Sequence, residues 1–70
     1  MNAIRRIRTE VFGISQIEMA RIARVRQATI SRWEHEVNHP SLAHLNRIRA
    51  EAARRKLPWD DGWLFGERAA

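Results

Sequence analysis

The sequence contains no cysteine and no tyrosine, only three glycines and two prolines, and no long apolar run. Without cysteine, neither a disulfide framework nor a thiolate metal site can form. No secretory leader or membrane-spanning run is recognisable, so we expect a cytoplasmic location. The hydrophobic fraction of 44% is ordinary for a folded chain. We therefore expect the 70 residues to form one domain, residues 1–70.

Acidic residues are scarce relative to basic ones. Eight acids stand against thirteen bases, twelve of which are arginine, and the formal net charge is +5. Residues 1–35 carry seven bases and three acids, whereas residues 57–70 carry one base and three acids. A basic domain of this size suggests a polyanionic partner, and the positive charge lies in the first half of the chain. An arginine-rich solvated surface alone would produce the same composition.

No constellation of catalytic or metal-ligating residues is visible in the sequence. His35, His39 and His44 are close together, but no cysteine or carboxylate pattern accompanies them, so we read them as turn and surface residues. Glu34 has no second carboxylate or nucleophile beside it and is better explained as an ion-pair partner. We expect no enzymatic activity, no cofactor and no bound metal.

Apolar residues recur at helical spacing, and strand-like alternation is absent, which predicts a compact all-α fold of five helices. The expected helices cover residues 2–11, 16–23, 27–35, 42–55 and 62–65. The residues expected on their buried sides are Ile4, Ile7, Val11, Met19, Ala20, Ala23, Ile30, Trp33, Leu42, Leu45, Ile48 and Ala52.

Several residues mark the expected helix ends. Gly13 ends the first helix, and Ser15 with Glu18 three residues later forms a capping box for the second. Ser41 is placed to cap the fourth helix, and Pro58 stops its continuation. Between the second and third helices lies a tight turn of residues 24–26, so residues 16–35 form a helix-turn-helix unit.

The third helix is predicted to expose a polar face. At about 100° per residue, one contiguous sector holds Gln27, Ala28, Ser31, Arg32 and His35. Ile30 and Trp33 fall on the opposite, apolar side. Glutamine pairs bidentately with adenine, arginine pairs with guanine, and alanine can touch a thymine methyl. This face therefore suits the major groove of DNA, and we assign Gln27, Ala28, Ser31 and Arg32 as base-reading residues.

The pattern resembles the Cro and phage-repressor type of helix-turn-helix domain, also called XRE-like. The residues that carry the resemblance are Ser15, Gln16, Glu18, Met19, Ala20, Val25, Thr29, Ile30, Ser31, Arg32, Trp33, Glu34, Pro40, Ser41, Leu42, Leu45 and residues 63–67. The resemblance implies a five-helix repressor-like fold that binds DNA. It also implies that Gln16, at the start of the second helix, holds a phosphate.

The chain departs from the family pattern at three turn positions. Arg24 stands where the family has glycine with a positive φ, which predicts either backbone strain at Arg24 or a different turn. Arg26 stands where the family has a serine cap, and it could reach a phosphate instead. Glu36 replaces a second glycine, so we expect Asn38 to adopt the left-handed conformation. We add Arg26, His35 and Asn38 to Gln16 as phosphate contacts.

The resemblance also implies an ion pair between the first helix and Glu34. In the family, an arginine of the first helix pairs with the glutamate at this position. Arg8 can fill that role only if the connection before Ser15 is one residue longer than usual.

The C-terminal stretch is rich in aromatic residues. Asp60 or Asp61 is expected to cap the last helix, and Gly66 to end it. We expect Trp63 and Leu64 to close the small core, and Trp59 and Phe65 to form part of a dimer interface, because aromatic residues near a terminus are typical of interfaces.

Together these observations predict a sequence-specific regulator of transcription that binds double-stranded DNA. A repressor acting as a homodimer, at least on DNA, on a pseudo-palindromic operator fits best, and a regulatory protein partner could control it. The main alternative is a protein-interaction module or antitoxin with the same fold, for which DNA binding is secondary. RNA binding is disfavoured because no aromatic residue is expected on the basic face for base stacking.

Overall fold

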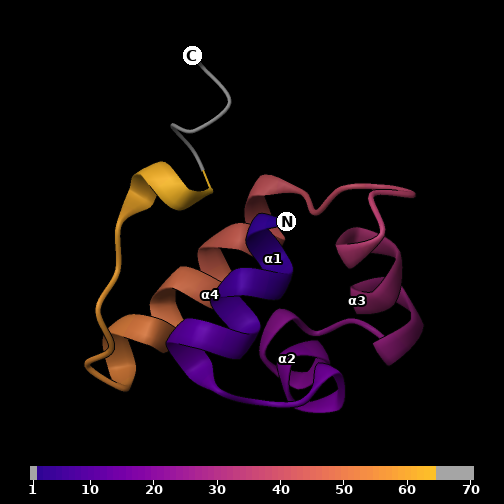
Figure 1. Ribbon diagram of the computed structural model, residues 1–70. Coiled ribbons are helices and arrows are strands. Elements are labelled where there is room, and N and C mark those ends of the chain that lie inside the picture. The colour runs from indigo at the N-terminus through magenta and orange to yellow at the C-terminus, as the bar shows by residue number, and fades with distance from the viewer. Residues whose placement is uncertain (1, 65–70) are drawn as a thin grey trace.

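The computed structural model describes residues 2–64, and these residues form helices and turns with no strand. Four α-helices occur, namely α1 (Ala3–Arg6), α2 (Gln16–Ala23), α3 (Gln27–Glu34) and α4 (Leu42–Arg54). A π-helical segment, η1 (Ile7–Phe12), continues α1, and a 3₁₀ turn, η2 (Asp61–Trp63), follows α4. The all-α prediction is confirmed, with helix ends within a few residues of those expected. Figure 1 shows α2 and α3 side by side, with η2 on the opposite side of the molecule from α3.

The first helical segment is extended by its π-helical half. The Asn2 side chain caps α1 by accepting hydrogen bonds from the amides of Ile4 (2.9 Å) and Arg5 (3.2 Å). The chain leaves η1 at Gly13, whose φ of 65° is readily adopted only by glycine. A π-helix closes its hydrogen bonds over one residue more than an α-helix. The extra residue needed between Arg8 and Ser15 is therefore accommodated within the helix.

Both predicted serine caps are present. The Ser15 hydroxyl accepts a hydrogen bond from the Glu18 amide (3.1 Å), and the Glu18 carboxylate lies 3.4 Å from the same hydroxyl. Ser41 accepts from the His44 amide (3.3 Å), and the Ser41 amide donates to His44 Nδ1 (3.1 Å), so His44 completes a capping box. These bonds satisfy amides that the first helical turn leaves without partners.

Three helices end on a non-glycine residue in the left-handed conformation. Arg24 (φ 62°), Glu36 (φ 59°) and Lys56 (φ 57°) follow α2, α3 and α4. Of the two alternatives at Arg24, the chain keeps the turn with a positive φ and accepts the strain. The expectation for Asn38 was wrong, because Glu36 itself takes the positive φ. Its amide donates to the Trp33 carbonyl (3.2 Å), which fixes the reversal directly at the end of α3.

The core is formed by one apolar side of each α-helix. Its buried residues are Ile4, Ile7, Met19, Ala20, Ala23, Ile30, Trp33, Ile48 and Ala52. Val11 and Leu45 pack against this core and are partly buried. Leu42 was expected in the core, but its side chain is 63% exposed. It is the first residue of α4, and a helical side chain leans toward the N-terminus, so Leu42 extends past the end of the packed region.

The predicted fifth helix is not formed within the described residues, where only the three-residue η2 is present. The Asp60 side chain caps it, as expected, by accepting from the Gly62 amide (2.8 Å). The amides of Trp63 and Leu64 then bond to carbonyls three residues earlier, which gives the tighter 3₁₀ geometry. Trp63 and Leu64 pack against the core, as predicted. Phe65 and Gly66 lie outside the described residues.

Candidate nucleic-acid interface

Helices α2 and α3 form the predicted helix-turn-helix unit, joined by the turn at residues 24–26. Ala20 and Ala23 are buried on α2, and their small side chains let neighbouring helices approach closely. Ile30 is fully buried and Trp33 is 2% exposed, so they anchor the inner face of α3. Arg47 of α4 donates to the Ala23 carbonyl (3.1 Å) and ties the end of α2 to α4.

The outer face of α3 carries the predicted base-reading residues. Gln27, Ala28 and Arg32 are exposed, and Ser31 is half-buried. Among the described residues, the exposed Arg32 guanidinium makes no hydrogen bond or ion pair, so its donors remain available to a ligand. The structure therefore presents an amide, a methyl group and a guanidinium together on one exposed helical surface.

A continuous chain of polar contacts supports this surface from behind. Gln27 Nε2 donates to Gln16 Oε1 (2.9 Å), and Gln16 Nε2 donates to Glu34 Oε1 (3.1 Å). Arg8 holds the other end, because its Nε donates to Glu34 Oε2 (2.7 Å) and its Nη2 to Glu34 Oε1 (3.2 Å). We call these four residues the Arg8–Gln27 chain. It links the first helical segment, the start of α2 and both ends of α3.

The ion pair at the base of this chain is largely shielded from solvent. The Glu34 side chain is 4% exposed, and that of Arg8 is 15% exposed. Burial alone would raise the pKa of Glu34, but hydrogen bonds from Arg8 and Gln16, with the charges of Arg8 and Arg5, outweigh it and lower this pKa. The hydrogen bond to Glu34 likewise raises the pKa of Arg8. Both groups are therefore charged at neutral pH, and the predicted ion pair is confirmed.

Hydrogen-bond capacity remains for a ligand at both glutamines. A side-chain amide nitrogen has two donor hydrogens, and each glutamine nitrogen spends one of them within the chain. Gln27 retains a second hydrogen and its carbonyl oxygen, which is the pair of groups needed for the edge of adenine. Gln16 retains one hydrogen beside the N-terminus of α2, where anions are favoured.

The remaining predicted phosphate contacts lie around α3. Arg26 is exposed at the N-cap position of α3 and provides no side-chain cap, as expected from its replacement of serine. His35 is exposed at the other end of α3, with Nδ1 2.8 Å from the Ser31 carbonyl oxygen. Asn38 is exposed in the loop that follows. None of these side chains joins the Arg8–Gln27 chain.

Sequence reasoning missed two features of this surface. It treated Gln16 and Gln27 separately, although their side chains are hydrogen-bonded to each other. Each is the first residue of its helix, and the packing of α2 on α3 brings these two helix starts together. It also passed over Arg5, whose charge acts on Glu34. The signal available was spacing, since Arg5 lies one helical turn before Arg8.

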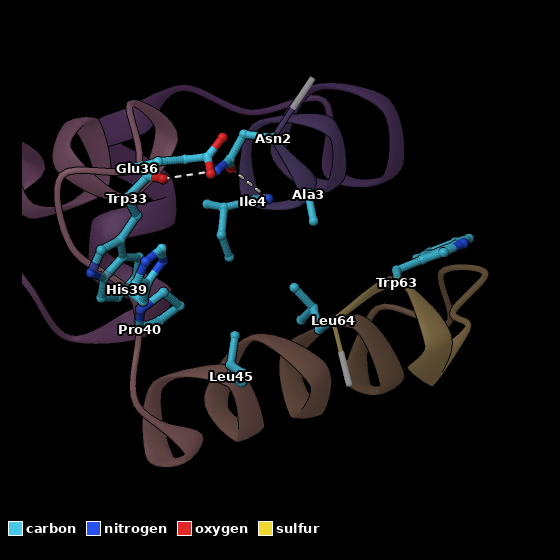
Figure 2. A pocket seen from close by; sticks show the side chains of 10 residues that line it. All are labelled: Asn2, Ala3, Ile4, Trp33, Glu36, His39, Pro40, Leu45, Trp63 and Leu64. Carbon is cyan, nitrogen blue, oxygen red and sulfur yellow. Dashed lines mark hydrogen bonds between the residues drawn. The ribbon is translucent and has the colours of Figure 1, made fainter. Parts of the chain in front are cut away.

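A cavity of about 280 Å³ lies between the start of α1, the loop after α3, α4, and residues Trp63 and Leu64 near the C-terminus (Figure 2). Ile4, Trp33 and Leu45 supply apolar walls, and Glu36 and His39 are its two ionisable lining residues. The described residues hold no group of three or more His, Cys, Asp or Glu side chains that could bind a metal ion. The residue that α3 contributes to the lining is Trp33, on its buried side, so the cavity lies away from the exposed polar face of α3.

The residues predicted for a dimer interface lie elsewhere. Trp59 is half-buried and contacts Trp63 edge-on, with ring centroids 5.8 Å apart. Its Nε1 donates to Asp61 Oδ1 (2.8 Å), and Asp61 also pairs with Arg49 of α4 (3.2 Å). Phe65 lies outside the described residues. The contacts of Trp59 described here are therefore contacts within one chain.

Comparison with known families matches this chain to a helix-turn-helix family. The family model described as helix-turn-helix matches residues 4–50, which is more than half of the chain. The match spans α1 to most of α4 and includes the whole Arg8–Gln27 chain. Comparisons with curated proteins and with solved structures gave no significant match. Within residues 2–64, no helix has the length and apolar character needed to cross a membrane.

Proposed function

Because the chain belongs to the helix-turn-helix family of the XRE/Cro type, which binds DNA and is typically non-enzymatic, we propose that it is a sequence-specific regulator of transcription. The observation that carries the proposal is the exposed face of α3, with Gln27 held in place by Gln16. Residues 1–70 would act as one DNA-binding domain, in the cytoplasm, where the DNA is accessible.

Base recognition is assigned to the outer face of α3. Gln27 would accept from adenine N6 and donate to N7 with the groups that Gln16 leaves free. Arg32 would donate to guanine O6 and N7, and Ala28 would contact a thymine methyl. Ser31, half-buried beside them, has a hydroxyl suited to either base. The hydrogen bond from Gln27 to Gln16 lowers the entropy lost when Gln27 binds a base.

Phosphate contacts would set the position of α3 in the groove. Gln16 combines its free amide hydrogen with the N-terminus of α2, and Arg26 contributes a full positive charge at the start of α3. His35 and Asn38 would contact the backbone from the other end of α3. These four contacts carry no sequence information themselves, but they determine which bases α3 can reach.

The proposed working unit is a homodimer. One domain reads only a few base pairs, so two copies on a pseudo-palindrome, with half-sites about one helical turn (roughly 34 Å) apart, would provide the required selectivity. A dimer on such an operator would exclude other proteins from a promoter, so we propose repression as the regulatory outcome.

Selection of tight binders from random duplexes, followed by salt titration, tests the proposal. We expect the selected duplex to bind roughly 10³-fold or more tightly than a scrambled duplex of equal length. Both affinities should fall with salt while most of this ratio is kept, because phosphate contacts contribute to both complexes. Equal affinity for selected and scrambled duplexes at every salt concentration would contradict sequence-specific binding.

A further inference from the structure

Glu36 differs from the other carboxylates of the described residues in having no side-chain partner. The others each accept a hydrogen bond or form an ion pair within the chain, and they are Glu10, Glu18, Glu34, Glu51, Asp60 and Asp61. No hydrogen bond or ion pair within residues 2–64 involves the Glu36 carboxylate. In a chain with thirteen bases and eight acids, this carboxylate is therefore left available to a cation from outside the chain.

The backbone at Glu36 is strained. Its φ is 59°, and its amide donates to the Trp33 carbonyl (3.2 Å) at the end of α3. Glycine would adopt this conformation without strain, whereas a residue with a side chain loses free energy there. Arg24 and Lys56 have the same strain, but of the three residues Glu36 is the one that lines the cavity shown in Figure 2. Strained residues are frequent at ligand sites, which points to a ligand for the Glu36 carboxylate.

The cavity beside Glu36 combines apolar walls with two unpartnered polar groups. We call it the loop cavity, and its volume is about 280 Å³. Figure 2 shows Glu36 and His39 at two of its edges, with the side chains of Ile4, Leu45 and Leu64 pointing into the space between them. The His39 ring, like the Glu36 carboxylate, makes no hydrogen bond or ion pair in the described part of the chain. No lysine or arginine is among the described residues that line the cavity.

These groups define the class of ligand that fits the loop cavity. A carboxylate binds a cation, a neutral imidazole has one acceptor nitrogen, and an ammonium group has three donors, so one ammonium can bond to both. An anionic ligand would meet Glu36 with no positive lining residue to offset the repulsion. One carboxylate and one imidazole are too few ligands for a structural metal site, and residues 2–64 hold no group of three. The volume limits the ligand to roughly ten heavy atoms.

We propose that the loop cavity is a binding site for a small amphipathic amine. Its ammonium group pairs with Glu36 and bonds to His39, and its carbon body contacts Ile4, Trp33 and Leu45. Glu36 and His39 are exposed, so solvent screens the ion pair, and the buried carbon supplies most of the affinity. We therefore expect a dissociation constant of roughly 1 mM. The site goes beyond the proposed function, because the cavity lies away from the exposed face of α3.

The test uses the full chain and three probes of nearly equal size, which are 2-phenylethylamine, 2-phenylethanol and phenylacetate. NMR follows binding through the methyl groups of Leu45 and Leu64 and the indole of Trp33. We expect the amine to shift these signals and to bind roughly threefold to fivefold more tightly than the alcohol, and phenylacetate to bind more weakly than both. The amine should also raise the unfolding temperature, because it binds the folded chain.

The substitution Glu36→Gln removes the charge and keeps the shape of the side chain. We expect the amine to lose its advantage over the alcohol, whose own affinity stays within twofold of that for the wild type. Glu18→Gln is the matched control, because it removes an exposed carboxylate that does not line the cavity. Glutamine keeps its place in the capping box with Ser15, so amine binding should stay as in the wild type.

The preference for the amine and its dependence on Glu36 decide the proposal. Equal affinity of the wild type for amine and alcohol would overturn it, and so would an amine advantage that survives in Glu36→Gln. Signals that shift mainly outside the loop cavity, or tighter binding of phenylacetate than of the amine, would assign the binding to another surface and overturn the proposal as well. None of these measurements involves DNA, so a negative result leaves the proposed function standing.

Discussion

The protein has two carboxylate–arginine groups, one at Glu34 behind α3 and one at Glu51 on α4, and they differ in solvent exposure and in the distance in sequence between their members. Glu34 is 4% exposed and is bound by Arg8 from another helical segment, 26 residues away in sequence. Glu51 is paired with Arg54 and Arg55 of its own helix, and the Arg54 side chain is 71% exposed. The first group connects elements distant in sequence, whereas the second lies within the last turn of α4 and its C-cap residue.

The difference shows that the number of ion pairs says little about the stability of this domain. An exposed pair exchanges hydration for a contact of similar free energy, and its side chains lose conformational freedom. When one member of a shielded pair is removed, the remaining charge cannot recover its hydration. Only the shielded pair is connected by hydrogen bonds to a residue on the exposed face of α3. If the face of α3 reads DNA as proposed, stability and recognition are coupled through Glu34 and not through Glu51.

The largest expected effect is that of Glu34→Ala. The substitution leaves the Arg8 guanidinium shielded without its partner, and we expect the free energy of unfolding to fall by about 2–3 kcal/mol, less than for a fully buried pair because solvent still reaches Arg8. Urea denaturation measures this. Glu34→Gln keeps an acceptor for both Arg8 and Gln16 and should recover part of the loss. A loss no larger than that of Glu51→Ala would remove the distinction between the two groups.

The next effect concerns DNA and compares arginines of the two regions. We expect Gln27→Ala and Arg32→Ala each to weaken binding to the selected duplex by about 1–3 kcal/mol, with the fold intact, because each removes a contact to a base edge. Arg54→Ala, which removes an equally charged residue from α4, is the matched control and should lose little. Competition binding against single-base variants measures the change. Equal losses on selected and scrambled duplexes would show that these residues touch only phosphates.

Arg26 should behave differently from Arg32, although both are exposed arginines of the same unit. We expect Arg26→Ala to weaken binding to all duplexes alike and to reduce the slope of log affinity against log salt by about one, since one phosphate contact is lost. Titrations at several salt concentrations measure the slope. A loss confined to one base position would move Arg26 from the phosphate contacts to the base-reading residues.

Local patterns explain which parts of the fold were predictable. The caps at Ser15 and Ser41 depend on residues at most three positions away, and the burial of Ile30 and Trp33 follows from helical spacing. The Arg8–Glu34 pair required a family resemblance, since the π-helical turn that aligns it has no clear sequence signal. The Gln16–Gln27 bond depends on the packing of two helices. Leu42, and the 3₁₀ turn that the described residues form where a fifth helix was expected, show that periodicity does not determine where a helix meets the core.

The ends of α2 and α4 offer a comparison in which we expect the same substitution to have the same effect at both sites. Arg24→Gly at the end of α2 and Lys56→Gly at the end of α4 should each stabilise the domain by about 0.5–1 kcal/mol, because glycine adopts a positive φ without strain. Thermal unfolding measures both. Gly13→Ala is the reverse change. An added Cβ would meet no atom within 4 Å, but alanine is strained at a φ of 65°, so we expect the substitution to destabilise the domain. A gain at Lys56 but not at Arg24 would show that the arginine has a compensating role in the turn.

The smallest expected effect is that of Glu51, and acid titration distinguishes it from Glu34. Hydrogen bonds from Arg54 and Arg55 lower the pKa of Glu51 to about 2. Solvent screens these pairs, because the side chains of Arg54 and Arg55 are 71% and 33% exposed, so we expect Glu51→Gln to change the urea midpoint at pH 7 far less than Glu34→Gln does. The lowered pKa of Glu34 does contribute to stability. Because a carboxylate with a lowered pKa stabilises the fold only while ionised, that contribution is present above the ordinary glutamate pKa and is lost as the pH falls through the lowered value.

Unfolding measured from pH 7 down to about pH 2, with carboxyl titration followed by NMR, tests both statements. Wild type and Glu51→Gln should lose stability in parallel as the pH falls, whereas Glu34→Gln, already less stable at pH 7, should lose less over the same range. Both carboxylates have lowered pKa values, and the two acid profiles show how much each contributes to folding. If Glu51→Gln flattened the acid profile as much as Glu34→Gln, the exposed cluster on α4 would contribute to stability as the shielded pair does, and the contrast between the two regions would fail.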